Sequence, residues 1–143
     1  MKVKNNIRFI EVLNSGIFFA KVMFSYKMEY DDIVKELKKQ KQKGWLQGLE
    51  MHKDLFDEGA KYFACRSKVK EEDTERLFFY LVYNQDFKFE DDCYVRLAHE
   101  CLHLCQFILP DFLNRDREYE CEAYLHGHFM TQALDAIRKN LKK

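Results

Sequence analysis

Two histidines and a glutamate, in a segment that reads His-Glu-Cys-Leu-His from His99 to His103, could together hold a metal ion and move a proton. The segment lies in an apolar run from Tyr94 to Leu109, which is typical of a helix. Residues four apart on a helix share one face, so both imidazoles can bind the same zinc ion. Glu100 is one residue further round, where a carboxylate can take a proton from a metal-bound water.

A third ligand for the same ion can come from an acidic segment further along the chain. A catalytic zinc ion usually has three protein ligands and keeps a fourth position for water. The segment from Asp116 to Tyr124 is expected to begin a second helix. Glu118 and Glu122 are four residues apart and share a face of that helix, whereas Glu120 points elsewhere. Glu118 and Glu122 are therefore the two candidates.

The two segments together resemble the gluzincins, a group of zinc peptidases. In gluzincins a His-Glu-x-x-His helix is followed by a second helix that supplies a glutamate, often with alanine after it. Glu122 and Ala123 stand at this place in the chain. The stretch from His99 to about Met130 also resembles short zincin-like proteins encoded by bacteriophages. The resemblance implies a zinc ion that is held by His99, His103 and Glu122.

The residues after the acidic segment decide between its two glutamates and add a further candidate. We prefer Glu122 to Glu118 because an alanine and apolar residues follow it, which indicates a buried helix. The acidic residue that gluzincins carry four positions after the ligand is replaced by His126. His126 shares the face of Glu122, and it is the candidate for stabilising the oxyanion of a tetrahedral intermediate. An internal histidine with a structural role is the alternative, and Tyr124 and His128 are weaker candidates as donors.

The five cysteines do not have the spacing of a disulfide framework, which fits a reducing compartment. A thiolate zinc site made by Cys101, Cys105 and Cys121 is an alternative, but it leaves the spacing of the histidines unused. The chain begins without the long apolar segment of a signal peptide, and none of its stretches matches a membrane helix. We therefore expect a cytoplasmic protein.

Length and charge favour a single domain without an obvious nucleic-acid partner, and the motif makes a peptide or protein the expected substrate. At 143 residues the chain can bury one core, with 1–90 as the scaffold and 91–143 as the metal-site helices. The 24 basic and 24 acidic residues balance, and the lysines from Lys35 to Lys43 are expected to form the solvated face of a helix. Neither nucleic acid nor a membrane is an expected partner. The oligomeric state is left open.

Apolar runs upstream of the metal-site helices predict two β-hairpins. The first joins Ile7–Leu13 to Ile17–Tyr26 through a turn that contains Gly16. The second joins Ala60–Ser67 to Arg76–Asn84 through a charged linker at 68–75. Because these runs follow each other as hairpins, a mostly antiparallel sheet is expected.

The remaining scaffold predicts how this sheet is covered. A helix is expected from Asp31 to near Gly44, whereas 45–59 has no clear pattern. The run from Leu77 to Tyr83 is apolar on both sides, which indicates a central strand that is covered on each face. The predicted fold is therefore α+β, with the sheet packed against the His-Glu-x-x-His helix and the C-terminal helix that follows.

These residues lead to the hypothesis of a zinc-dependent peptidase, or a closely related amide hydrolase. Glu100 acts as general base toward a metal-activated water, which attacks the substrate carbonyl. By analogy with other such enzymes, the substrate lies as an added strand on a sheet edge, which we expect at Ala60–Ser67 or Ile17–Tyr26. The alternatives are a catalytically inactive binding module of a phage or mobile element, and a metal ion with a purely structural role.

Overall fold

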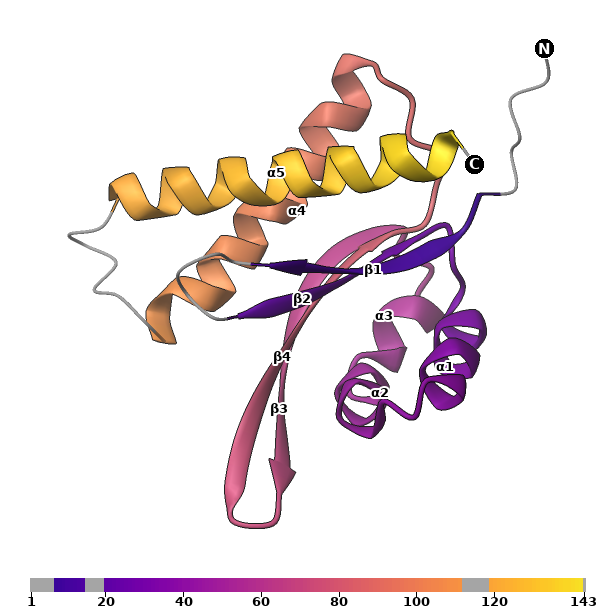
Figure 1. Cartoon of the computed structure of the whole chain (residues 1–143), viewed down its shortest axis with the longest axis vertical. Helices are drawn as coiled ribbons and strands as arrows, with labels where there is room; N and C mark the ends of the chain where they lie inside the picture. Colours follow the sequence, from indigo (N-terminus) through magenta and orange to yellow (C-terminus); the bar gives the residue numbers. More distant parts are fainter. Residues whose placement is uncertain (1–6, 15–19, 112–118, 143) are drawn as a thin grey trace.

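A four-stranded sheet lies between two layers of helices, so the chain has an α+β fold (Figure 1). The computed structural model describes residues 7–14, 20–111 and 119–142. Helices α1 to α3 pack on one face of the sheet, and α4 and α5 pack on the other (Figure 1). In chain order the elements are β1 (Phe9–Asn14), β2 (Lys21–Tyr26), α1 (Tyr30–Lys39), α2 (Lys43–Glu50), α3 (Lys53–Asp57), β3 (Tyr62–Glu71), β4 (Thr74–Tyr83), α4 (Asp91–Ile108), the 3-10 turn η2 (Leu109–Asp111) and α5 (Tyr119–Leu141).

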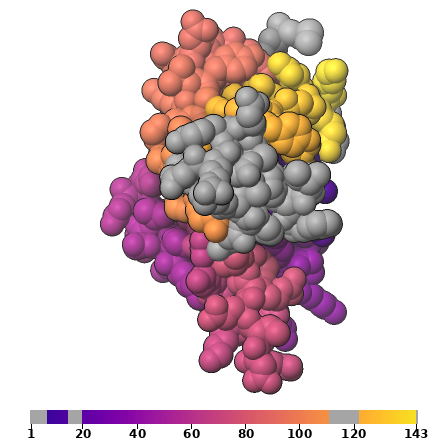
Figure 2. All heavy atoms as spheres, turned by 90° about the vertical axis from the view of Figure 1, so that its left-hand side faces the viewer, coloured from indigo at the N-terminus to yellow at the C-terminus, as the bar shows by residue number. Residues whose placement is uncertain are grey.

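The strands of both predicted hairpins pair as expected, and the second hairpin is longer than expected, whereas the predicted turn at Gly16 lies outside the described residues. Strands β1 and β2 pair antiparallel, from Phe9 opposite Tyr26 to Asn14 opposite Lys21. Strands β3 and β4 also pair antiparallel, and their ladder reaches Glu71 opposite Thr74. The charged segment predicted as a linker is therefore mostly strand. Its lysines alternate with buried residues, the pattern of a half-buried strand, and the hairpin projects beyond the helices (Figure 2).

The sheet is mixed, because β2 and β4 run parallel between the two hairpins. The strand order is β1-β2-β4-β3, so β4 is interior and buried on both faces, as its sequence predicted. The prediction of Ile17–Tyr26 as a sheet edge is wrong, because β2 has β1 on one side and β4 on the other. The edges are β1 and β3, so the prediction of an edge at Ala60–Ser67 is confirmed.

The face with α1 to α3 is packed most closely where α2 crosses the sheet. This helix occupies part of the segment for which the sequence showed no clear pattern. Gly48 lets its backbone approach the sheet, where Ser67 Oγ donates a hydrogen bond of 2.6 Å to the Gly48 carbonyl. Tyr80 Oη donates a bond of the same length to the Trp45 carbonyl. A side chain at Gly48 would collide with the Tyr80 hydroxyl.

The other face buries α4 and α5 against the interior strands. Apolar residues of α4, from Cys93 to Ile108, share one core with Leu125, Phe129 and Ile137 of α5. Among the described residues, no helix combines the length and the apolar character that crossing a membrane requires.

Two glycines that both lie in helices should respond in opposite ways to alanine. Gly48→Ala should lower the free energy of unfolding by about 1–3 kcal/mol, because the added methyl group meets Tyr80 and Ser67. Gly127→Ala should raise it by about 0.5–1 kcal/mol, because the new Cβ would meet no described atom within 4 Å beyond the backbone of its own helix, and alanine favours a helix. Urea unfolding of the two variants measures both values, and a destabilised Gly127→Ala or an unchanged Gly48→Ala would contradict this packing.

Candidate metal centre

Helix α4 presents its two histidines on the side opposite to the core. Its buried side chains recur at helical spacing and face the sheet and α5. His99 is exposed and His103 is half-buried. The helix begins after Glu90 with Asp91 and Asp92 in its first turn, where negative charge is favourable. It covers the predicted run and begins one turn earlier.

The two imidazoles point their outer nitrogens at one another. His99 Nε2 and His103 Nε2 lie 3.0 Å apart, and the two rings are nearly perpendicular at 87°. Two nitrogens that bind one tetrahedral zinc ion at about 2.0–2.1 Å are separated by about 3.3 Å. The histidine pair therefore has close to the spacing that a shared metal ion requires. Without a metal ion, the same distance allows one Nε2–H group to donate to the other ring.

Gln106 orients one of these rings. Its Oε1 lies 3.1 Å from His103 Nδ1. An amide oxygen can only accept, so in this pairing Nδ1 carries the proton and the Nε2 lone pair faces His99. Metal-binding histidines generally have such a partner on their other nitrogen. The sequence analysis missed Gln106, although its position three residues after His103, on the same helix face, was a signal for this contact.

Glu100 lies on the flank of α4 that faces strand β3. By helical periodicity it shares a stripe with Arg96 and Phe107. Arg96 Nη1 donates to Tyr62 Oη at 3.3 Å, and the Phe107 carbonyl lies 3.5 Å from Arg66 Nη1. Tyr62 and Arg66 both belong to β3, so this strand runs alongside the half-buried Glu100.

Glu122 is half-buried on α5. Its charge acts on Cys105, which faces the core: burial first, and then Glu122, raises the pKa of the Cys105 thiol to about 12. Among the described residues, no three His, Cys, Asp or Glu side chains come together to hold a metal ion. The structure thus brings His99 and His103 together but adds no described third ligand. Glu122 as that ligand stays a prediction, and Glu118 lies outside the described residues.

His126 ties α5 to α4 directly beside the histidine pair. Its Nε2 donates to the carbonyl of Ala98, the residue before His99, at 2.9 Å. This contact is the structural role that the sequence left open, and the role toward an oxyanion stays a prediction. His128 instead stacks on Tyr124, at an angle of 10° between the rings. Both of these side chains lie at the surface of α5 or close to it.

The structure also shows where the cysteines of the alternative thiolate site and His52 lie. Cys101 and Cys105 are buried on the core side of α4, and burial raises the pKa of both thiols. Cys121, the third residue of the thiolate alternative, has no described side chain. His52, which the sequence motif does not include, is half-buried, and its Nε2 donates to the Arg66 carbonyl at 2.9 Å.

Comparison of the chain with protein-family models, with curated proteins and with solved structures gave no match. The resemblance to the gluzincins therefore rests on the motif and on the residues that follow it.

Removal of the Gln106 amide should weaken zinc binding without unfolding the chain. Gln106→Leu takes away the acceptor for His103 Nδ1, so the free protein no longer favours the tautomer that binds the metal. We expect about 10–100-fold weaker zinc binding, as for other partners of metal-bound histidines. Competition with a chromophoric chelator measures the affinity.

Two control variants test whether the weaker zinc binding comes from loss of the contact between Gln106 and His103. Gln106→Glu keeps an acceptor and should retain native affinity, whereas Gln47→Leu makes the same change at an exposed position of α2 and should have no effect. Equal zinc affinity of Gln106→Leu and the native chain would show that Gln106 does not orient His103.

Proposed function

We propose that the protein is a zinc-dependent peptidase that hydrolyses peptide bonds or related amide bonds. The observation that carries this proposal is the pair of imidazole nitrogens 3.0 Å apart on the outer side of α4, with Glu100 on the adjoining flank. A helix needs only its core stripe to be buried, and neither the convergence of the two rings nor the Gln106 contact is required for that burial.

The nitrogen and oxygen donors of the two histidines and the proposed glutamate are of the types that zinc binds. Two neutral imidazoles are common zinc ligands, and the Gln106 contact favours the tautomer of His103 that offers its Nε2 lone pair. Glu122, or Glu118 in its place, is proposed to complete the set of ligands. When bound, the ion supplies an acidified water and polarises the carbonyl of the substrate.

Glu100 carries the proton in this proposal. Its carboxylate accepts a proton from the attacking water and passes it to the amine nitrogen that leaves. Glu100 follows His99 and, by helical periodicity, lies on the flank of α4 toward β3, which supports this role. His126 is proposed to stabilise the oxyanion, which requires its ring to turn away from the Ala98 carbonyl.

Strand β3 is the sheet edge that we propose for the substrate. The other edge, β1, is closed at its end by the Gln132 amide, whose Nε2 donates to the Asn14 carbonyl and whose Oε1 accepts from the Asn14 N–H. This amide pairs with the backbone as a neighbouring strand would. Strand β3 has β4 on one side only and, by helical periodicity, runs beside Glu100, so a peptide added to it would pass the histidine pair. The Arg66 carbonyl of β3 already accepts from His52, so the peptide is proposed to pair with the rest of the strand.

Glu100→Gln should separate catalysis from metal binding. The amide cannot accept the proton, so cleavage of a proteome-derived peptide library, measured by mass spectrometry, should fall by about 10²–10⁴-fold. Zinc content should stay at the native level, because Glu100 is not a ligand. Glu75→Gln makes the same change at an exposed position of β4 and should leave cleavage unchanged.

The other outcomes of this experiment are equally informative. Native-level cleavage by Glu100→Gln would exclude Glu100 as the base, and loss of zinc from this variant would show that Glu100 is itself a ligand. Zinc binding by a native chain that cleaves no peptide would favour the inactive binding module instead.

A further inference from the structure

Two adjoining hollows lie on the face of the sheet that is turned away from α4, and so away from the candidate metal centre. The first, of about 300 Å³, has Ile10, Val12 and Met23 on its floor and Trp45 on its wall. The second, of about 290 Å³, lies over Leu46 where α1 turns into α2. Leu37 and Gln42 line both hollows, so the two form one continuous surface. Val12, at the β1 edge, is 58% exposed.

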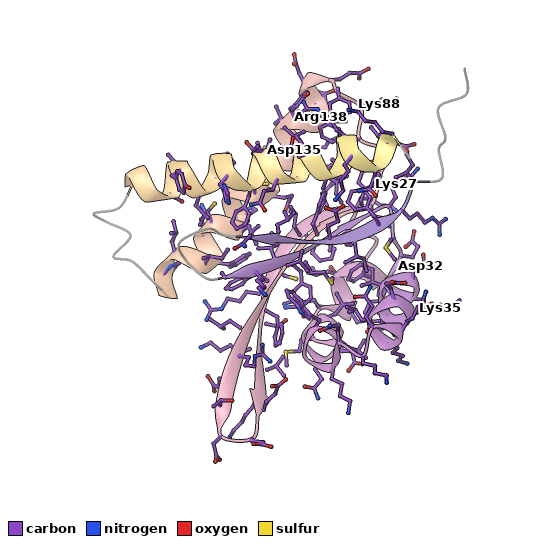
Figure 3. The ribbon with its side chains drawn as sticks, viewed as in Figure 1. Lys27, Asp32, Lys35, Lys88, Asp135 and Arg138 are labelled. Carbon is purple, nitrogen blue, oxygen red and sulfur yellow. The ribbon has the colours of Figure 1, made fainter. Side chains whose placement is uncertain are left out.

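Four lysines line this surface, which we call the lysine hollow. Lys21 lines the first hollow, and Lys38, Lys41 and Lys43 line the second. All other lining residues are apolar or glutamine. No described acidic residue lines either hollow, although Glu36 accepts from Gln40 at the rim of the first and Glu71 lies beside Gly44 near the second. Lys35, one turn earlier on α1, also points into solvent (Figure 3).

Local helix stability does not explain these charges. Lys38, in the last turn of α1, is favoured by the helix dipole, but Lys43 is the first residue of α2, where the dipole disfavours a cation. Lys41 has a positive φ of 57°. It follows the C-cap of α1, where the Lys41 N–H donates to the Lys38 carbonyl and the Gln42 N–H donates to the Leu37 carbonyl. Glycine is the usual residue at this position because a side chain is strained there.

Local helix stability accounts for neither Lys41 nor Lys43, so the positive charge at the rim of the hollows is available to a partner. We propose that the lysine hollow binds an acidic segment of a partner protein, whose apolar side chains enter the two hollows. Carboxylates would pair with the lysine rim, as electrostatic complementarity requires. A flat bilayer or a phosphate backbone could use the lysines but would leave the concave apolar floor empty. The hollows therefore favour a protein segment.

Selection from a library of random displayed peptides tests this inference. Binders to the native chain should be enriched in Asp and Glu interspersed with large apolar residues. The selected peptide should bind about tenfold more weakly to the double variant Lys41→Gly/Lys43→Gln, as measured by fluorescence anisotropy. Glycine relieves the positive φ of residue 41, so this variant should melt no lower than the native chain. Added salt should weaken binding to the native chain.

A control variant that loses two lysine charges elsewhere tests whether the loss of binding is specific to the lysine hollow. Lys88→Gln/Lys142→Gln removes two exposed charges that lie outside both the lysine hollow and strand β3, and should leave binding unchanged. Equal weakening by this control, or selected peptides without an acidic and apolar composition, would overturn the proposal. Tighter binding to phosphatidylserine vesicles or to a DNA oligonucleotide than to the selected peptide would overturn it too. Zinc content is unaffected by these variants, so the result is independent of the proposed peptidase function.

Discussion

The rotation of α4 about its own axis is the constraint on which the rest of the candidate site depends. Burial of the stripe from Cys93 to Ile108 against the sheet and α5 fixes this rotation. The opposite stripe must then face outward, and it carries His99 and His103. The flank between the two stripes carries Glu100 and faces β3. Core packing, rather than any contact of the histidines themselves, therefore determines where the metal-binding nitrogens point.

The sheet separates two surfaces of different chemistry. On the side of α4, the imidazoles of His99 and His103 and the amide of Gln106 come together, and Glu100 lies on the flank toward the edge strand β3. On the side of α1 and α2, lysines surround two apolar hollows. Strand β4 is buried on both of its faces and contributes to the core on each side of the sheet. A partner on the lysine hollow would therefore not compete with a substrate along β3.

Local patterns predicted the elements better than they predicted how the elements meet. The hairpins, the central strand and the helix around His99 follow from periodicity, which is a property of neighbouring residues. The parallel pairing of β2 with β4 joins residues far apart in the chain, and no local pattern carries it. At the candidate metal centre, too, contacts between residues far apart in the chain could not be predicted. The spacing of the histidines predicted their convergence, whereas the contact of His126 with Ala98 depends on how α5 crosses α4.

The most direct test is the zinc content of the purified, untagged chain after zinc is supplied and the excess removed. The measurement is elemental analysis of the native chain and of His103→Ala, Glu122→Ala and Glu118→Ala. The account predicts about one zinc ion per native chain, none in His103→Ala, and a reduced content in only one of the two glutamate variants. A native chain without zinc, or zinc that persists in His103→Ala, would contradict the assignment of a metal centre to α4.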